Sequence, residues 1–205
     1  NDGIPRTAPI NAFDGRYNNF WHVNSADTFP KWLQADLGSS QTLDRVVSFT
    51  YGGYALTEDG NRVKDFQIWV GDDPLFSSGS YVVAASVAGN DALIRQVTFG
   101  PVTGRYVRFV VFAAKGANYW NTGLNEVELW SSTTMTVTKA GTGTGSVTSE
   151  PAGINCGSSC GASYDYNTVV TLTALPAPGS TFTGWSGACT GTGSCVVTMD
   201  AAKAV

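Results

Sequence analysis

The chain has 205 residues, of which 14 % are charged, and its net charge at pH 7 is −4. This length allows one large or two ordinary domains, and a composition rich in Gly, Ser, Thr and aromatic residues disfavours long helices. An acidic chain without a Lys/Arg run argues against nucleic-acid binding, and no apolar stretch approaches the roughly 18 residues of a membrane span.

Residues 1–131 predict an all-β domain built from short strands. Apolar and polar residues alternate in runs that are separated by turn sequences such as Asp59-Gly60-Asn61 and Gly89-Asn90-Asp91. Short strands with turns between them are typical of an antiparallel sandwich or barrel, and no amphipathic helix is evident. The predicted strands are Trp32–Leu37, Asp44–Tyr51, Lys64–Val70, Tyr81–Val87, Ile94–Phe99, Arg105–Phe112 and Glu126–Trp130.

A change of composition after Trp130 predicts a second domain. Residues 1–131 hold 13 acidic and 10 basic residues, whereas residues 132–205 hold 3 and 2. We therefore expect domains at 1–131 and 135–205, joined by a linker at 132–134 that is too short to let them move far apart. The opening Asn1-Asp2-Gly3 predicts a mature or excised fragment.

The second domain is also predicted to be β. Met135–Lys139 and Gly145–Ser149 are expected to form a hairpin around Gly141-Thr142-Gly143. Further strands are expected at Val169–Ala174, Phe182–Trp185 and Cys195–Met199. About 70 residues make a thin core, so covalent cross-links are expected to matter to its stability.

The four cysteines lie in this domain, at Cys156, Cys160, Cys189 and Cys195. An even number in a small Gly/Ser/Thr-rich segment predicts two disulfides and an oxidising, extracellular compartment, with the pairing left open. A four-cysteine zinc site is the alternative, although the spacings are looser than in the usual paired zinc knuckles.

Catalytic chemistry is not indicated by the residues. A serine or cysteine hydrolase needs a base beside its nucleophile, and His22 is the one histidine. A glycosidase needs two carboxylates facing each other across a cleft, and no pair stands out. Gly141–Gly145 lacks the lysine and the strand-to-helix context of a phosphate-binding loop. The chain is therefore expected not to be an enzyme.

Several motifs of the first domain resemble the discoidin family, also called coagulation factor 5/8 type C. Asn11–Gly15, Phe20-Trp21-His22 and Trp32–Gly38 resemble the opening of that domain. Arg62–Val70, Gly100-Pro101-Val102, Arg105–Phe109 and Asn125–Leu129 then fit in order. The resemblance implies a jelly-roll β-sandwich.

Within the family the chain is most similar to bacterial carbohydrate-binding module family 32, because Tyr119-Trp120-Asn121 precedes the closing strand. This resemblance implies a non-catalytic, monomeric module that binds a poly- or oligosaccharide, of galactose type or containing uronic acid. It also implies a secreted bacterial glycoside hydrolase or polysaccharide lyase as the parent chain, whose catalytic domain the module directs to glycan.

Residues 135–205 resemble a bacterial extracellular repeat domain that serves as a spacer in secreted multidomain enzymes. The matching segments are Gly145–Ser149, Gly153–Cys160 and Phe182–Cys189. The resemblance implies one more strand after Val205, and it names no ligand for this part.

The discoidin resemblance also implies a structural calcium ion that clips the first loop to the last strand. Calcium takes six to eight oxygen donors, including main-chain carbonyls. Asp14 and Glu126 are expected to give carboxylates, Asn19 its amide oxygen, and Asn11, Arg16 and Asn125 carbonyl oxygens. The alternative is that Asp14 only caps an Asp-Gly turn.

The sugar site is predicted in the segment 115–123. A sugar is held by an aromatic ring against its apolar face and by directed hydrogen bonds to its hydroxyls. Trp120 is the predicted stacking ring, and the polar contacts are expected from Asn118, Tyr119, Asn121, His22, Tyr54 and Arg62. Alternatively, Trp120 packs under the sandwich, His22 is a partly buried loop residue and Arg62 pairs with a surface aspartate.

Two observations qualify the expected ligand. Trp21 is predicted to belong to the core, and neither Tyr54 nor Ala55 is the arginine that galactose-binding relatives usually carry in this loop. An adhesion module that binds a protein or a lipid headgroup is the competing function. The scarcity of apolar spikes and basic residues on the loops favours sugar over membrane.

Overall fold

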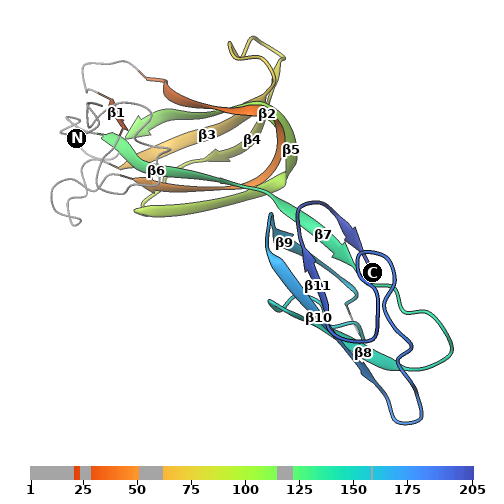
Figure 1. Cartoon of the computed structure of the whole chain (residues 1–205). Helices are drawn as coiled ribbons and strands as arrows, with labels where there is room; N and C mark the ends of the chain where they lie inside the picture. The colour runs from red at the N-terminus through yellow and green to blue at the C-terminus, as the bar shows by residue number, and fades with distance from the viewer. Residues whose placement is uncertain (1–20, 24–28, 51–61, 115–121, 158) are drawn as a thin grey trace, which may run out of the picture. The chain divides into compact units, whose positions relative to one another are not determined.

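The computed structural model describes residues 21–23, 29–50, 62–114, 122–157 and 159–205. The chain divides into two compact units, Asn1–Trp130 and Ser131–Val205, and both are built from strands (Figure 1). In this described part, no helix is long and apolar enough to cross a membrane. Residues 132–134, which were predicted as a linker, begin a strand of the second unit.

The first unit contains one antiparallel six-stranded sheet whose order is β1-β6-β2-β5-β3-β4. Its strands are β1 (Trp21–Val23), β2 (Lys31–Thr50), β3 (Val63–Gly71), β4 (Tyr81–Val87), β5 (Ile94–Ala114) and β6 (Thr122–Trp130). The all-β prediction is confirmed, and the short β1 is a strand that the sequence pattern did not reveal.

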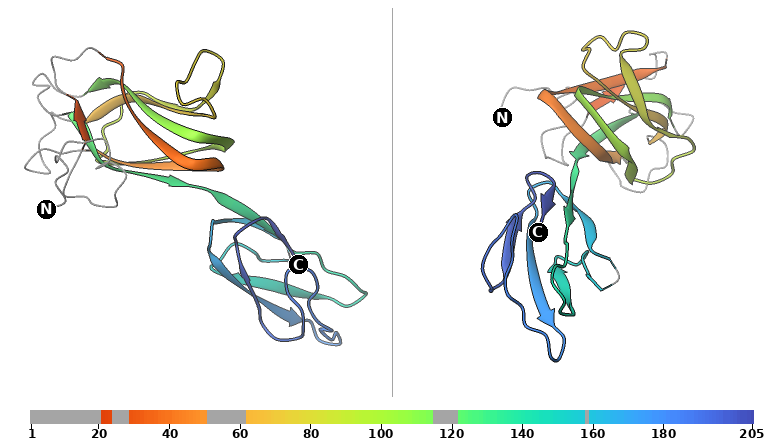
Figure 2. Two further views of the ribbon diagram at one scale, coloured as in Figure 1. Left: turned by 45° about the horizontal axis from the view of Figure 1, so that its top comes forward. Right: turned by 90° about the vertical axis from the view of Figure 1, so that its right-hand side faces the viewer.

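Two long strands, β2 and β5, curl this sheet over its own core (Figure 2). Lys31–Asp36 pairs with residues 106–111, whereas Gln41–Phe49 pairs with residues 94–104. The register shifts between Asp36 and Gln41, and again between Leu43 and Arg45. Each strand had been predicted as two, because the apolar alternation is interrupted at the bend although the backbone pairing resumes.

The core of the first unit follows the period of the strands. Phe66 and Phe109 stack with their ring centroids 4.6 Å apart, and each is 1 % exposed. Trp21 is 6 % exposed and belongs to the same cluster, so its predicted role in the core is confirmed. The other large buried members include Leu33, Leu43, Val46, Ile68, Val70 and Leu124.

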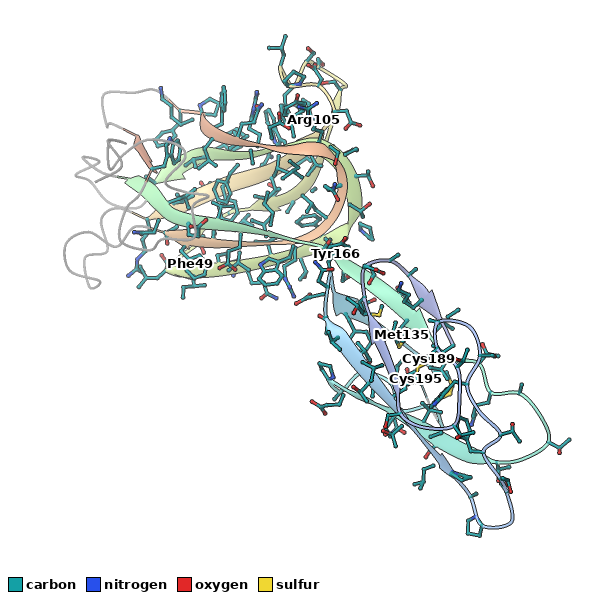
Figure 3. The ribbon with its side chains drawn as sticks, viewed as in Figure 1. Phe49, Arg105, Met135, Tyr166, Cys189 and Cys195 are labelled. Atoms are coloured by element: carbon teal, nitrogen blue, oxygen red, sulfur yellow. A yellow bond between two sulfur atoms is a disulfide. The ribbon has the colours of Figure 1, made fainter. Side chains whose placement is uncertain are left out.

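The bent end of the sheet is held by an ion pair between β2 and β5, near the label of Arg105 in Figure 3. Arg105 donates from Nε to Asp36 Oδ1 at 2.7 Å and from Nη2 to Oδ2 at 2.8 Å. The backbone N–H of Arg105 also donates to Asp72 Oδ1 at 2.9 Å. The side-chain hydrogen bond from Arg105 lowers the pKa of Asp36 to about 2.

We expect an NMR titration of the side-chain carboxyl carbons to give Asp36 a pKa of about 2 and Arg105→Gln to raise it. Because the folded pKa lies below the unfolded value of about 3.9, the stabilisation is present above that value and is lost as the pH falls towards 2. The control is Asp73, whose pKa is lowered by hydrogen bonds from Ser77 and Leu75. An Asp36 pKa that stays unchanged in Arg105→Gln would contradict this account.

The second unit consists of two three-stranded sheets, ordered β11-β10-β8 and β12-β7-β9. Their pairs are antiparallel except for β12 with β7, which is parallel. The strands are β7 (Ser132–Thr136), β8 (Gly145–Glu150), β9 (Gly161–Asp165), β10 (Val169–Pro176), β11 (Cys195–Thr198) and β12 (Lys203–Ala204). Met135, Leu172 and Met199, each 0 % exposed, lie in the core of this unit.

The predicted hairpin at 135–149 is wrong. β7 pairs with β9 and β12, whereas β8 pairs with β10, so the two strands belong to different sheets. The Gly-rich stretch between them carries the chain from one sheet to the other, and Gly141 adopts a φ of 89° there. A glycine turn between two β runs therefore did not imply that the runs pair with each other.

The predicted strand Phe182–Trp185 is also wrong. Gly184 has a φ of 136°, which breaks an extended run, and Trp185 forms only an isolated bridge with Gly191. The indole Nε1 of Trp185 donates to Gly193 O at 2.7 Å, and its ring meets Phe182 edge-on at 4.9 Å. This segment is a folded loop that is fixed by an aromatic pair.

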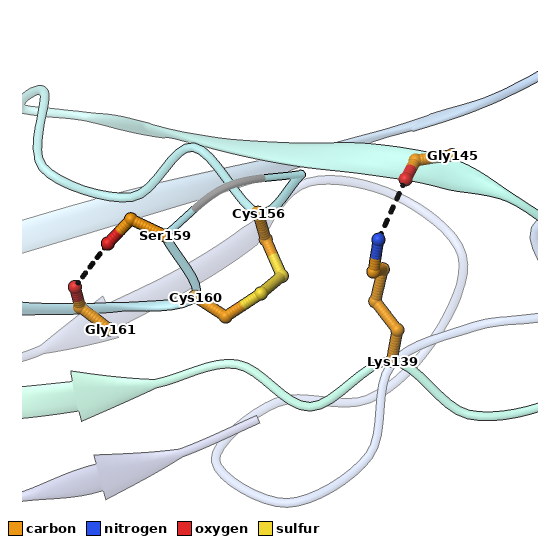
Figure 4. The surroundings of a disulfide bond; sticks show 6 residues. All are labelled: Lys139, Gly145, Cys156, Ser159, Cys160 and Gly161. Carbon is orange, nitrogen blue, oxygen red and sulfur yellow. Dashed lines mark hydrogen bonds between the residues drawn. A yellow bond between two sulfur atoms is a disulfide. The ribbon is translucent and has the colours of Figure 1, made fainter.

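Two disulfides join cysteines that are close in sequence, and all four cysteines are bonded. Cys156 pairs with Cys160 (Figure 4), and Cys189 pairs with Cys195 (Figure 3). Cys156 and Cys195 are 0 % and 1 % exposed and belong to the core of the second unit. The predicted disulfides are confirmed, and the zinc alternative is excluded because every sulfur is used.

We expect replacement of either pair by serine to lower the free energy of unfolding of the second unit by about 2 kcal/mol. The bonded cysteines are only 4 and 6 residues apart, and short loops restrict the unfolded chain least. Differential scanning calorimetry of the two double variants measures the loss, and the transition of the first unit is the internal control. An equal shift of both transitions would contradict the assignment.

Candidate functional site

Three connections between strands begin and end at one end of the first unit, and we call this end the loop end. At this end Val23 pairs with Thr122, Thr50 with Leu124, and Val63 with Ala114. Segments 51–61 and 115–121 therefore leave and re-enter the sheet at the same end, where β1 also ends (Figure 1). The pairing thus anchors both ends of the predicted sugar segment, and both ends of the segment that contains Tyr54, at the loop end.

Most of the predicted ligand contacts lie outside the described residues. They comprise four predicted calcium ligands of the first loop and five predicted sugar contacts. The calcium ligands are Asn11, Asp14, Arg16 and Asn19, and the sugar contacts are Tyr54, Asn118, Tyr119, Trp120 and Asn121. Their roles stay predictions.

Arg62 lies at the loop end, where it contacts the turn between β4 and β5. Its Nη1 donates to the carbonyl oxygen of Asp91 at 2.7 Å, and its side chain is partly buried. The alternative expected for Arg62, a surface pairing with Asp65 or Asp59, stays a prediction, and Asp59 lies outside the described residues. A sugar contact of Arg62 stays a prediction.

The turn between β4 and β5 is fixed by side chains that were not singled out as part of the site. Asn90 is 4 % exposed and donates from Nδ2 to Val63 O at 2.9 Å. Thr50 is 5 % exposed and donates from Oγ1 to Leu93 O at 2.9 Å. These bonds tie the ends of β2 and β3 to one turn. An Asn between two Gly/Asp neighbours signals a turn, but its bond to a residue 27 positions away cannot be read from local sequence.

His22 is placed beside the predicted sugar segment by strand pairing. β1 pairs His22 with Gly123, two residues after Asn121. The backbone positions of His22 and of the start of β6 are therefore neighbours in the sheet, as a shared site requires. The contact of its imidazole with a sugar stays a prediction.

Glu126 is the one predicted metal ligand whose side chain the structure buries, with 3 % exposed. Its Oε1 accepts a hydrogen bond from the N–H of Val127 at 3.2 Å. The pairing of β6 with β2 shifts register between Phe49 and Thr50, so that Asn125 lies opposite no residue of β2. The burial of Glu126 and the register shift at Asn125 are compatible with the calcium expectation for these two residues, which stays a prediction. The described residues by themselves contain no group of three or more His, Cys, Asp or Glu placed to hold a metal ion.

The clear pKa shifts of carboxyl groups among described residues have structural causes. Arg105 lowers the pKa of Asp36, hydrogen bonds from Ser77 and Leu75 lower that of Asp73, and Lys203 lowers that of Asp200. Each shift extends the charged form of the aspartate to lower pH. These shifts therefore report structural contacts.

Comparisons with known proteins agree with this architecture. Residues 11–109 match the sequence profile of the F5/F8 type C family described as NedA-like, galactose-binding domain. Residues 134–205 match the divergent InlB B-repeat domain. Both recognitions made from the sequence are confirmed. No curated protein matches the chain.

Two solved carbohydrate-binding modules are similar to this chain. A chitosan-binding module 1 from a chitosanase/glucanase of Paenibacillus sp. IK-5 has 25 % identity and a TM-score of 0.50, over 62 % of this chain and 88 % of that one. The family 32 carbohydrate-binding module of Streptococcus pneumoniae EndoD has 18 % identity and a TM-score of 0.52, over 63 % of this chain and 88 % of that one. The second likeness concerns the fold alone.

Proposed function

Because the chain combines a discoidin-type (F5/8 type C) domain with an InlB B-repeat domain, we propose that it is a non-catalytic carbohydrate-binding module of a secreted bacterial polysaccharide-degrading enzyme. One observation carries the proposal: strands β5 and β6 anchor the segment with Trp120 at the same end of the sheet as Arg62 and the backbone of His22. The likeness to a chitosan-binding module supports an oligosaccharide as the ligand.

The parent enzyme is proposed to be a glycoside hydrolase or polysaccharide lyase, and the module to act as a monomer. The two disulfides support an oxidising, extracellular location, because such bonds persist mainly outside the cytosol. The InlB B-repeat unit then serves as a spacer that is stabilised by its own cross-links. In this arrangement the first unit holds glycan near a catalytic domain of the same chain.

The proposed contact with sugar is shallow. A ring at Trp120 covers one apolar face of a sugar, and amide groups at Asn118 and Asn121 bond its hydroxyls. Few ligand atoms are buried in such a site, so the dissociation constant is expected to be on the order of 10–1000 μM.

We expect Trp120→Ala to weaken glycan binding about thirty-fold, because truncation of a central aromatic contact costs about 2 kcal/mol. Isothermal titration calorimetry with the oligosaccharide that binds best on a glycan array measures the effect. Trp130→Ala is the matched control, because Trp130 is a partly exposed tryptophan on β6, 36 % exposed, outside the loop end. Unchanged binding by Trp120→Ala would reject the proposed site.

We also propose that a structural calcium ion joins the loop with Asp14 to Glu126. A ligand that binds only the folded state at a concentration a hundred times its Kd stabilises by about 2.7 kcal/mol. EDTA is therefore expected to lower the melting temperature of the first unit and to leave the second unit unchanged.

Two variants distinguish the loss of a bound calcium ion from a general effect of the chelator on stability. Glu126→Gln should abolish the response to calcium, whereas Glu128→Gln, two residues along the same strand, should retain it. Glu128 is a suitable control because its Oε2 already accepts a hydrogen bond from the indole of Trp130 at 3.1 Å. A melting temperature of the parent protein that is the same with calcium and with EDTA would refute the calcium site.

A further inference from the structure

The outer face of β2, β3 and β5 holds an arginine between two aromatic rings. The guanidinium carbon of Arg108 lies 4.0 Å from the ring centroid of Trp32 and 4.2 Å from that of Phe76. Strand pairing places Arg108 opposite Gln34 on β2 and opposite Trp69 on β3. Arg108 is 8 % exposed although it points away from the core, because the two rings cover its faces.

The polar bonds of Arg108 leave part of the guanidinium unused. Nε and Nη2 donate to Gln34 Oε1 at 3.0 and 2.7 Å, and Nη2 donates to Pro74 O at 3.3 Å. Nη1 has no hydrogen-bond acceptor among the residues that the structure describes, and this nitrogen is not completely buried. One edge of the guanidinium therefore faces solvent.

The positive charge of Arg108 is not matched by an ion pair in the described part of the chain. Burial lowers the pKa of Arg108, and Asp73 is the carboxylate whose charge it feels. That carboxylate already accepts hydrogen bonds from the N–H groups of Leu75 and Ser77 at 2.9 and 3.0 Å. A partly desolvated cation without a paired anion attracts an anionic acceptor more strongly than a neutral one.

An exposed aromatic ring lies next to this charge, since Trp32 is 50 % exposed. Phe112, which is 40 % exposed, lies farther along β5 towards the loop end, at the register shift between β5 and β3. Trp32 pairs with Val110 of β5. The guanidinium covers one face of the indole of Trp32, which leaves the exposed part of the ring as a fixed platform.

This face is continuous with the loop end. β5 ends at Ala114, two residues after Phe112 and directly before the segment 115–121. β2 begins at Lys31, one residue before Trp32. The predicted sugar segment therefore adjoins the end of β5 that carries this face.

We propose that the outer face around Phe112, Trp32 and Arg108 is a second contact surface for the same glycan, and that it selects a sugar unit bearing a carboxylate. The exposed part of the Trp32 ring stacks on one sugar unit, Phe112 extends the surface towards the loop end, and Nη1 of Arg108 donates to the carboxylate. This inference rests on the proposed function, and it selects one of the two ligand classes that the family resemblance implies: an oligosaccharide that contains uronic acid rather than one of galactose type.

The test is a 15N–1H NMR titration of the full chain with trigalacturonate and, in parallel, with neutral galactotriose. The indole N–H signals of Trp32 and Trp120 report the two contact surfaces separately, and that of Trp130 is the control. Trp130 is matched because it too lies under an arginine, with Arg45 4.8 Å from its ring centroid. We expect trigalacturonate to shift the signals of Trp32 and Trp120, and to bind about five-fold more tightly than galactotriose.

Variants separate binding from folding. Trp32→Ala should weaken binding of trigalacturonate about ten-fold, whereas Trp32→Phe should keep most of the affinity and Trp130→Ala all of it. Arg108→Gln, which removes the charge, should remove the preference for the acidic trimer, with the fold checked by the dispersion of the amide spectrum. If Trp32→Ala unfolds the unit, the signal of Trp32 in the parent protein still decides.

The outcomes distinguish this inference from the proposed function. A shift of Trp120 without a shift of Trp32 overturns the second surface and leaves the carbohydrate-binding function standing. Equal affinity for the acidic and neutral trimers overturns the selection of a carboxylate. No shift of either signal with either trimer, together with no binding on a glycan array, overturns the proposed function itself.

Discussion

The architecture of the first unit depends on the close approach of backbone at the bend of β2 and β5. A Cβ on Gly104 would lie 2.8 Å from the backbone nitrogen of Gly71, and a Cβ on Gly71 would lie 2.6 Å from Ser80 O. Both contacts are shorter than real Cβ atoms make, so only glycine lets β5 pass β3 at this point. Because β2 and β5 turn here, the outer ends of both strands return to the loop end. The end to which both strands return is the one where segments 51–61 and 115–121 leave the sheet.

Electrostatics fix the same bend from the outside. The bidentate pair of Arg105 with Asp36 joins β5 to β2 across the register break, and Asp72 ties the start of the β3–β4 loop to Arg105 and Ser40. Arg108 lies three residues farther along β5 and holds the same loop through Pro74 and Phe76. The RYVR sequence of β5 therefore uses its two arginines for different tasks. Arg105 fixes the turn. Arg108 organises the outer face and keeps one donor edge of its guanidinium free.

The sequence pattern predicted most strands of the first unit because their apolar residues alternate, and the structure places the alternating Phe66 and Ile68 in the core. It could not show that Trp32–Leu37 and Asp44–Tyr51 belong to one bent strand, since pairing across a bend depends on residues about 70 positions away. In the second unit, β7 and β8 looked like a hairpin because local turn chemistry was right, yet their partners β9 and β10 come later in the chain. The metal and sugar contacts were predicted by resemblance alone, and of these only Glu126, Asn125 and Arg62 have described side chains.

The net charge of −4 does not decide against an acidic glycan. Exposed charges farther away than about 8 Å are largely screened at physiological ionic strength, so the local charges of the binding face matter most. On the outer face of β2 and β5 the carboxylate of Asp36 is neutralised by Arg105, and Asp73 is bonded by its own loop. Arg108 is left as the charge without an ion-pair partner among the described residues of that face. A partly covered guanidinium is also screened less than an exposed one. An acidic protein can therefore present a locally cationic contact, and the class of ligand is better inferred from that face than from the composition of the chain.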